Sequence, residues 1–224
     1  MILIIPDVLT VEEQSQLQLL ASQSNFVDGK ETAGFRAKLV KNNEQVAKGE
    51  ANKKKLQEIV TTALLRSTEF RRGAIPLRIR PPLISRYRPG MTYGLHVDDS
   101  LMGSTLARDR TDVSCTVFIN DVGDYEGGEL VVHSPYGVQE VKLPARYAVI
   151  YPSGTLHEVA EVTKGERLVA VTWIQSYVRD ERHRQFLYDA LKIRDKPHSI
   201  DPKMPEADTA SHLYTNLLRL WAEN

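Results

Sequence analysis

The stretch "YGLHVDDS", residues 93–100, places two ionisable side chains, His96 and Asp98, two positions apart in a segment with the character of a strand. Residues two apart in a strand lie on the same face of the sheet, so the imidazole and the carboxylate point the same way. Two ionisable side chains on a half-buried face require a partner that compensates their charge. With one more histidine it would form the two-histidine, one-carboxylate arrangement that favours Fe(II) with open coordination positions.

His157, in "YPSGTLHEV", is the best candidate for that further ligand. It stands at the start of a strand late in the β-rich part of the chain, and both ends of an antiparallel core can be neighbours in space. We interpret His133 as a structural or surface residue, because it abuts a Pro-Tyr-Gly turn. The remaining histidines, His183, His198 and His212, lie in a C-terminal helical region.

Arg167 follows His157 by ten residues and begins the apolar run "LVAVTWI". An arginine that enters a buried strand needs an anionic partner. Its planar guanidinium suits a carboxylate. If the partner is a ligand, we expect a small acid bound beside the metal.

The middle of the chain, from about residue 78 to residue 177, has the pattern of many short strands separated by Gly and Pro turns. This pattern predicts an antiparallel sandwich or barrel. The segment "EVTKGERL" predicts a hairpin turn in which Gly165 has a positive φ.

Helical patterns flank this core. We expect a helix over residues 10–26, opened by a Thr10/Glu13 capping box, and a second helix over residues 52–71. Residues 179–224 return to helix, with the proline-rich segment 196–208 expected to be a loop.

The predicted organisation is therefore an α+β chain in three parts. Residues 1–77 are an N-terminal helical support, residues 78–177 are the β core, and residues 178–224 are a C-terminal helical extension.

Composition excludes several classes of function. The 224 residues carry no formal net charge, so the charge argues for neither a nucleic-acid binder nor a membrane-surface protein, and we expect neither partner. The N-terminus does not have the form of a signal peptide, and no apolar run is long enough to span a membrane. The single cysteine, Cys115, is interpreted as a buried core residue, so we expect a cytoplasmic protein.

Taken together, His96, Asp98, His157 and Arg167 resemble the motif of the Fe(II)- and 2-oxoglutarate-dependent dioxygenases. "YEGGEL", residues 125–130, and "SRYRPGMTYGLHVDDS" are similar to the prolyl-4-hydroxylase-like branch of that superfamily. The length and the helical tail are similar to the bacterial PKHD-type hydroxylases. The resemblance spans the chain.

The resemblance implies a double-stranded β-helix, or jelly roll, in which His96, Asp98 and His157 bind Fe(2+). It implies that Arg167 binds the distal carboxylate of 2-oxoglutarate, the cosubstrate, and that the enzyme uses O2 to hydroxylate a substrate with release of succinate and CO2. It also implies a need for L-ascorbate.

The chain departs from relatives at two points. Some use a lysine for 2-oxoglutarate, but Lys164 falls in the predicted turn, so Arg167 is preferred. Others supply a tyrosine hydroxyl from the strand in which this chain has Phe118; Tyr87 is either a substitute or a plain core residue.

Some assignments stay open at this point. Residues 98–112 are either a mobile, substrate-facing loop or a plain surface connection. The arginines concentrated between residues 71 and 88 are solvated strand edges or a site for an acidic partner; they are Arg71, Arg72, Arg78, Arg80, Arg86 and Arg88. The apolar C-terminal helix packs on its own core or on a second subunit, so a homo-oligomer is open.

Two other functions compete with the hydroxylase. One is a metal-binding jelly-roll module without turnover, and the other is a cupin-type metal enzyme that does not use 2-oxoglutarate. Arg167 disfavours the first, because a binding module has no use for a cosubstrate anchor. The substrate, whether peptide, amino acid or small metabolite, is not identified by the sequence.

Overall fold

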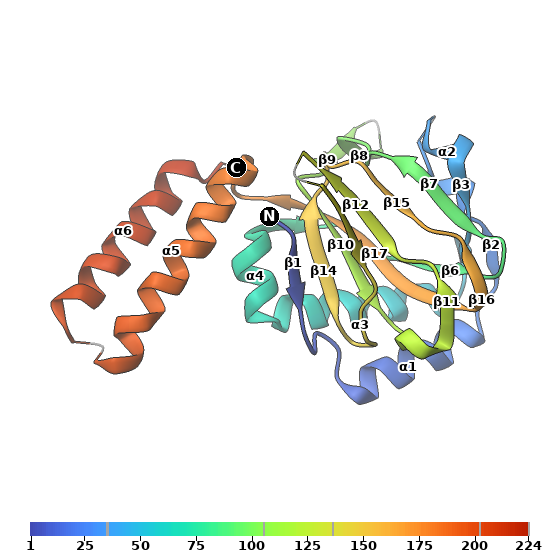
Figure 1. The fold of residues 1–224 in the computed structure, drawn as a ribbon, viewed down its shortest axis with the longest axis horizontal. Helices are drawn as coiled ribbons and strands as arrows, with labels where there is room; N and C mark the ends of the chain where they lie inside the picture. The colour runs from blue at the N-terminus through green and yellow to red at the C-terminus, as the bar shows by residue number, and fades with distance from the viewer. Residues whose placement is uncertain (35, 105, 136, 202, 224) are drawn as a thin grey trace.

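Two antiparallel sheets face one another at the centre of the molecule (Figure 1). The computed structural model describes residues 1–34, 36–104, 106–135, 137–201 and 203–223. Within these residues the larger sheet has the order β1-β14-β10-β17-β6-β4-β2, with β5 also paired to β17, and the smaller sheet has the order β13-β12-β15-β7-β3. Strands distant in sequence alternate as neighbours, which confirms the predicted jelly roll.

The strands of the larger sheet are β1 (Leu3–Ile5), β2 (Phe26–Asp28), β4 (Glu44–Val46), β5 (Pro76–Ile79), β6 (Leu83–Tyr87), β10 (Val113–Phe118), β14 (Ala148–Pro152) and β17 (Arg167–Ser176). Those of the smaller sheet are β3 (Lys41–Asn42), β7 (Thr92–His96), β12 (Leu130–Ser134), β13 (Gly137–Val141) and β15 (His157–Val159). Two further pairs are β8 (Leu101–Ser104) with β9 (Ala107–Arg110), and β11 (Tyr125–Gly127) with β16 (Val162–Gly165).

β10 lies in the interior of the larger sheet, and the apolar character of its residues suits that position. All six of its residues are buried, and it lies between β14 and β17. A strand covered on both faces reads as a continuous apolar run, as "VSCTVF" does. Cys115 is 1% exposed, in agreement with its interpretation as a core residue.

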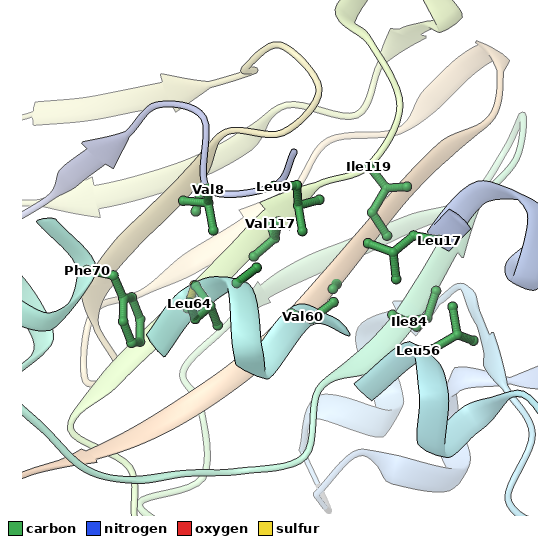
Figure 2. Packing of buried hydrophobic residues seen from close by; sticks show 14 of the residues in the cluster. Val8, Leu9, Leu17, Leu56, Val60, Leu64, Phe70, Ile84, Val117 and Ile119 are labelled. Carbon is green, nitrogen blue, oxygen red and sulfur yellow. The ribbon is translucent and has the colours of Figure 1, made fainter. Parts of the chain in front are cut away.

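Helices cover the outer face of the larger sheet. They are α1 (Val11–Ser22), α3 (Lys53–Arg66) and α4 (Thr68–Ala74). The apolar stripe of α3, formed by Leu56, Val60 and Leu64, packs in one cluster with Ile84 and Val117 of the sheet (Figure 2). Burying this stripe, rather than helix propensity, is what stabilises such a helix.

The predicted N-terminal helix is confirmed, with its capping box. The hydroxyl of Thr10 accepts from the Glu13 amide at 3.2 Å, and the Glu13 carboxylate accepts from the Thr10 amide at 2.9 Å. The helix expected over residues 52–71 is instead two helices. α3 ends at Arg66, and the hydroxyl of Ser67 caps α4 by accepting from the Phe70 amide at 3.3 Å.

The N-terminal segment also supplies strands to both sheets, which the sequence did not indicate. β1 pairs with β14, β4 with β6, and β3 with β7. Short helical turns, η1 (Gly29–Thr32) and α2 (Ala37–Val40), connect β2 to β3, and η2 (Val122–Asp124) precedes β11. Residues distant from the motif strands therefore reach the centre of the fold.

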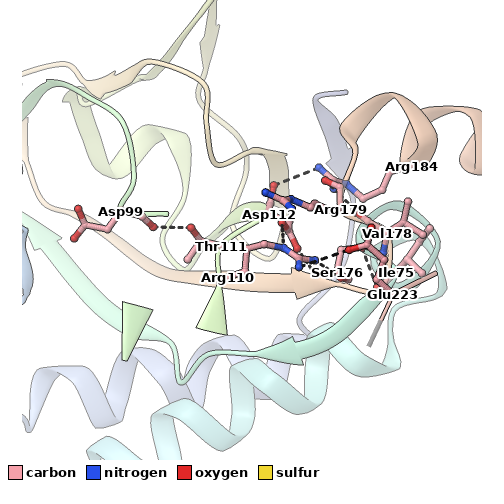
Figure 3. Close-up of polar contacts among 10 residues, drawn as sticks. All are labelled: Ile75, Asp99, Arg110, Thr111, Asp112, Ser176, Val178, Arg179, Arg184 and Glu223. Carbon is pink, nitrogen blue, oxygen red and sulfur yellow. Dashed lines mark hydrogen bonds and ion pairs between the residues drawn. The ribbon is translucent and has the colours of Figure 1, made fainter. Parts of the chain in front are cut away.

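Within residues 98–112, β8 and β9 pair as antiparallel strands, which the sequence did not indicate. This pair of strands is held at its base, where the hydroxyl of Thr111 donates to the Asp99 carbonyl at 2.6 Å (Figure 3).

The C-terminal extension is a pair of helices, α5 (Glu181–Ile200) and α6 (Pro205–Trp221), which project to one side of the sheets (Figure 1). The loop expected over residues 196–208 is wrong at both ends. α5 continues through Pro197 to Ile200, and α6 begins at Pro205. A proline inside a helix lacks an amide donor, and its ring crowds the carbonyl four residues before it. The turn after Pro197 is nevertheless kept, because the Asp201 amide donates to the Pro197 carbonyl at 3.0 Å. Pro205 stands at the start of α6, where a proline is favoured.

Among the described residues, no helix has an apolar stretch long enough to cross a membrane.

Candidate metal centre

Three predicted residues lie together between the two sheets. His96 ends β7, His157 begins β15, and the two are register partners across that strand pair. Asp98 follows two residues beyond the end of β7, so its carboxylate is directed by an irregular segment and not by the strand that the sequence predicted. One ligand atom from each residue lies within 4.8 Å of the others.

The same kind of hydrogen bond orients both histidine rings. Nδ1 of His96 lies 2.8 Å from the Gly94 carbonyl, and Nδ1 of His157 lies 2.9 Å from the Thr155 carbonyl. A carbonyl only accepts, so Nδ1 carries the hydrogen and Nε2 keeps a free lone pair. Such a partner fixes the ring orientation of a metal-binding histidine.

Aromatic rings hold the two imidazoles in place. Tyr93 stacks on His96 with ring centroids 3.6 Å apart, and the ring of Tyr151 meets His157 edge-on at 5.0 Å. Burial, and then the charge of His157, lower the pKa of His96 to about 4. Around neutral pH His96 is therefore neutral, as a metal ligand must be.

The carboxylate of Asp98 is also fixed. The hydroxyl of Ser114 donates to Asp98 Oδ2 at 2.6 Å and lies 2.8 Å from the hydroxyl of Ser153. The same Oδ2 lies 3.7 Å from His157 Nε2, and the two side chains are only 8% and 5% exposed. Two imidazole nitrogens and one carboxylate oxygen thus converge in a buried position, a donor set that fits Fe(II) and leaves other positions open.

Arg167 lies in the same cavity as these three residues. Its side chain is 1% exposed, and no carboxylate of the described residues lies within ion-pair distance of it. Its Nε is buried without a hydrogen-bond partner. An unpaired buried guanidinium is costly, so an anionic ligand would relieve it.

The surroundings of Arg167 explain two sequence features. The rings of Tyr87 and Phe118 lie 5.1 and 5.5 Å from the guanidinium carbon, so both flank it. Gly128 of "YEGGEL" has a φ of +67°, and a Cβ there would lie 3.0 Å from Arg167 Cδ. Lys164, by contrast, is exposed and pairs with Glu126 at 3.0 Å.

The structure adds a cation to the cavity that sequence reasoning missed. Lys41 of β3 is 5% exposed, donates to the Thr32 hydroxyl at 3.2 Å, and lies 5.1 Å over the ring of Tyr93. Burial lowers the pKa of Lys41 to about 8. No motif marks it, because it reaches the site only through the pairing of β3 with β7. Trp173 of β17 also lines the cavity, with its Nε1 buried and unpartnered.

Other candidate residues lie outside this cluster. His133 contacts Glu158 at 3.1 Å, and the remaining histidines are on α5 and α6. Several arginines of the basic concentration have acidic partners within the chain: Arg72 with Asp195, Arg78 and Arg80 with Asp109, Arg86 with Glu44, and Arg88 with Glu166.

Comparison with known proteins agrees with this geometry. Residues 82–175 match the 2OG-Fe(II) oxygenase superfamily. A prolyl hydroxylase from Trichoplax adhaerens, solved in complex with a hypoxia inducible factor oxygen degradation domain peptide fragment, has the same fold with a TM-score of 0.56 at 17% identity, over 83% of this chain and 86% of that one. The fold and the site define a 2-oxoglutarate-dependent dioxygenase.

Closer relatives cover the whole chain, the C-terminal helices included. A PKHD-type hydroxylase from Acaryochloris marina (strain MBIC 11017) is 48% identical over 223 residues, and one from Synechococcus sp. (strain JA-3-3Ab) is 45% identical over 223 residues, each with 100% of both chains covered. The chain belongs to the PKHD-type hydroxylases.

Proposed function

We propose that the protein binds Fe(II) through His96, Asp98 and His157, binds 2-oxoglutarate through Arg167, and hydroxylates a substrate with release of succinate and CO2. The observation that carries this proposal is the buried, unpaired guanidinium of Arg167 in the same cavity as the three convergent ligand atoms. A metal would occupy the position on which the three ligand atoms converge, and a dicarboxylate would give Arg167 the anionic partner that it does not have among the described residues.

The chain's own residues then act by binding, orienting and excluding water. Iron, when bound, supplies the activation of O2 that organic side chains do not provide. Nε2 of each histidine and one oxygen of Asp98 would hold it, while Arg167 would fix the distal carboxylate and so orient the keto acid. Burial of these residues keeps bulk water away from the reacting atoms.

Three further inferences belong to this proposal: a second cofactor, a role for Lys41 and a location in the cell. We infer an L-ascorbate requirement from the resemblance to hydroxylases that use it. Lys41 is positioned to contact whatever occupies the cavity beside Tyr93. A cytoplasmic location is retained as a prediction.

Formation of succinate without added substrate tests the proposal. We expect Fe(II)-loaded protein in air to convert 2-oxoglutarate slowly to succinate. His157→Ala should abolish this conversion, and Arg167→Leu should raise the 2-oxoglutarate concentration that it requires. Lys164→Leu removes an exposed lysine nearby and serves as the control, with unchanged conversion. Equal succinate formation by wild type and His157→Ala would contradict the proposed site.

A further inference from the structure

The C-terminal helices carry an apolar face that stays exposed in the described structure. Phe186, Ile193 and Ile200 of α5 and Leu213 and Leu220 of α6 are between 52% and 76% exposed. Within each helix the residues are seven apart, so each set forms one stripe along its helix. Single exposed apolar residues are ordinary, but an ordered set of three on one helix and two on the adjacent helix is not.

The two stripes lie on the same side of the helix pair. Contacts between α5 and α6 include His183 with Trp221, Arg194 with Tyr214, and His198 with Ser211. Phe186, at the margin of the exposed stripe, also lies near Trp221, with ring centroids 6.4 Å apart. At 100° per residue, each exposed stripe is roughly a third of a turn from these contact positions. The direction of that rotation is opposite in two antiparallel helices, which places both stripes on one side.

The opposite side of α5 is fixed to the catalytic part of the molecule. Arg184 is 4% exposed and donates to the Val178 and Arg179 carbonyls at 2.8 Å each, and to the Asp112 carbonyl at 3.3 Å (Figure 3). Farther along, Asp195 pairs with Arg72 of α4 at 2.6 Å. The apolar face therefore has a defined orientation and points away from the sheets.

We propose that this face binds the same face of a second copy of the chain, so that the two helix pairs form a four-helix bundle. Seven-residue spacing on two adjacent antiparallel helices is the pattern of such bundles. An isologous pairing uses the same face on both copies and needs no other partner.

The size of the face is sufficient for a stable dimer. Helices of 20 and 17 residues are about 30 and 25 Å long. Two such helices packed side by side present a footprint of roughly 500–600 Å² on each copy. The total of about 1,100 Å² clears the roughly 1,000 Å² expected of a biological interface, although it is less than the roughly 1,200–2,000 Å² of standard-size interfaces.

Charge selects the arrangement within the bundle. α5 carries five basic and three acidic side chains, whereas α6 carries one basic and two acidic side chains. Placing α5 of one copy on α6 of the other pairs opposite net charges, whereas α5 on α5 would bring like charges together. Because Arg194 is level with Tyr214 within one chain, this arrangement brings Ile193 opposite the partner's Leu213.

Sedimentation equilibrium of the full chain, from about 1 to 100 µM, tests the dimer. We expect a dimer in wild type. Ile193→Asp and Leu213→Asp each place a charge in the bundle and should weaken association at least about 100-fold. Val138→Asp changes a residue of β13 that is 60% exposed, and it should associate as wild type does. A monomer throughout, or a dimer that survives both aspartates, would overturn the proposal.

Cysteine cross-linking tests the arrangement. Copies with Ile193→Cys are mixed with copies of different mass that carry Leu213→Cys, and the native Cys115 is too buried to compete. A disulfide between unlike copies is expected to form faster than one between like copies. Preferential linkage of Ile193→Cys to itself would contradict the α5-on-α6 pairing. Retained binding of 2-oxoglutarate with Mn(II) shows that each variant is folded.

Discussion

At the scale of single residues, the site depends on groups that orient the proposed metal ligands as well as on those ligands. Each histidine is held by the carbonyl two residues before it, and Asp98 is held by Ser114. The H-x-D spacing and the late histidine could be read from the sequence. Ser114 could not, because β10 brings it to Asp98 only through the sheet.

Ser114→Ala should weaken metal binding about tenfold, because partners of this kind typically contribute 10- to 100-fold to affinity. The measurement is competition between the protein and a metal indicator, with Mn(II) as the probe. Ser22→Ala, on the far end of α1, is the control. An unchanged affinity in Ser114→Ala would show that the 2.6 Å contact to Asp98 has no role in orienting the carboxylate.

Lys41→Met should stabilise the metal-free protein at pH 7. Folding lowers the pKa of Lys41 from 10.5 to about 8. The buried ammonium therefore costs stability below pH 8, and this cost is lost as the pH rises toward 10.5. Its size is roughly 2–3 kcal/mol.

Urea unfolding at pH 7 and pH 10 tests this, since the stability difference from wild type should be large at pH 7 and small at pH 10. Lys38→Met, which changes an exposed lysine on α2, should have little effect at either pH. A Lys41→Met protein that is less stable than wild type at both pH values would contradict the account.

At the scale of elements, the backbone conformation between two strands determines the direction of the strand that follows. Gly165, shortly before β17, is an example. Gly165 has the positive φ that the sequence predicted, +74°, and a Cβ there would lie 2.0 Å from the Asp124 carbonyl. The predicted hairpin is wrong, because β16, which ends at Gly165, pairs with β11, whereas β17 pairs with β10, β6 and β5. Gly165→Ala should therefore lower the free energy of unfolding by at least about 1–3 kcal/mol.

Gly154→Ala is the matched control, because a Cβ at Gly154 meets nothing within 4 Å. Chemical denaturation of both variants measures the difference. Equal stability of the two variants would contradict the role assigned to the Gly165 turn.

The sequence predicts those elements that depend on the pattern of their own residues. It does not predict those that depend on contacts with other segments of the chain. The buried strands β10 and β17 and the capped helix α1 follow from their own residues. The pairing of β8 with β9 does not, because their mostly exposed residues show no alternation toward a core. The sequence also does not predict the end of α5. A proline is typical of a helix break, but the turn after Pro197 remains hydrogen-bonded and α5 continues to Ile200.

At the scale of the whole molecule, the site exists only when distant segments pair. β7 and β15 bring His96 to His157, and β3 brings Lys41. A ligand that binds only the folded chain stabilises it by mass action, by about 2.7 kcal/mol at 100 times its dissociation constant.

Mn(II) at that excess should therefore raise the unfolding temperature of wild type by roughly 5–10 °C. His157→Ala should show no such increase, and His133→Ala, which lies outside the cluster, should respond as wild type does. A rise of equal size in His157→Ala would show that the metal binds elsewhere.

The most direct test of the central claim is an anaerobic titration of the metal-free protein with Fe(II) and then 2-oxoglutarate, followed by visible absorption. The account predicts a charge-transfer band from a keto acid chelated to iron. That band should be absent in His96→Ala, and it should require far more 2-oxoglutarate in Arg167→Ala. Bound iron without a band in wild type, or a band that does not depend on Arg167, would contradict the joint site for iron and 2-oxoglutarate.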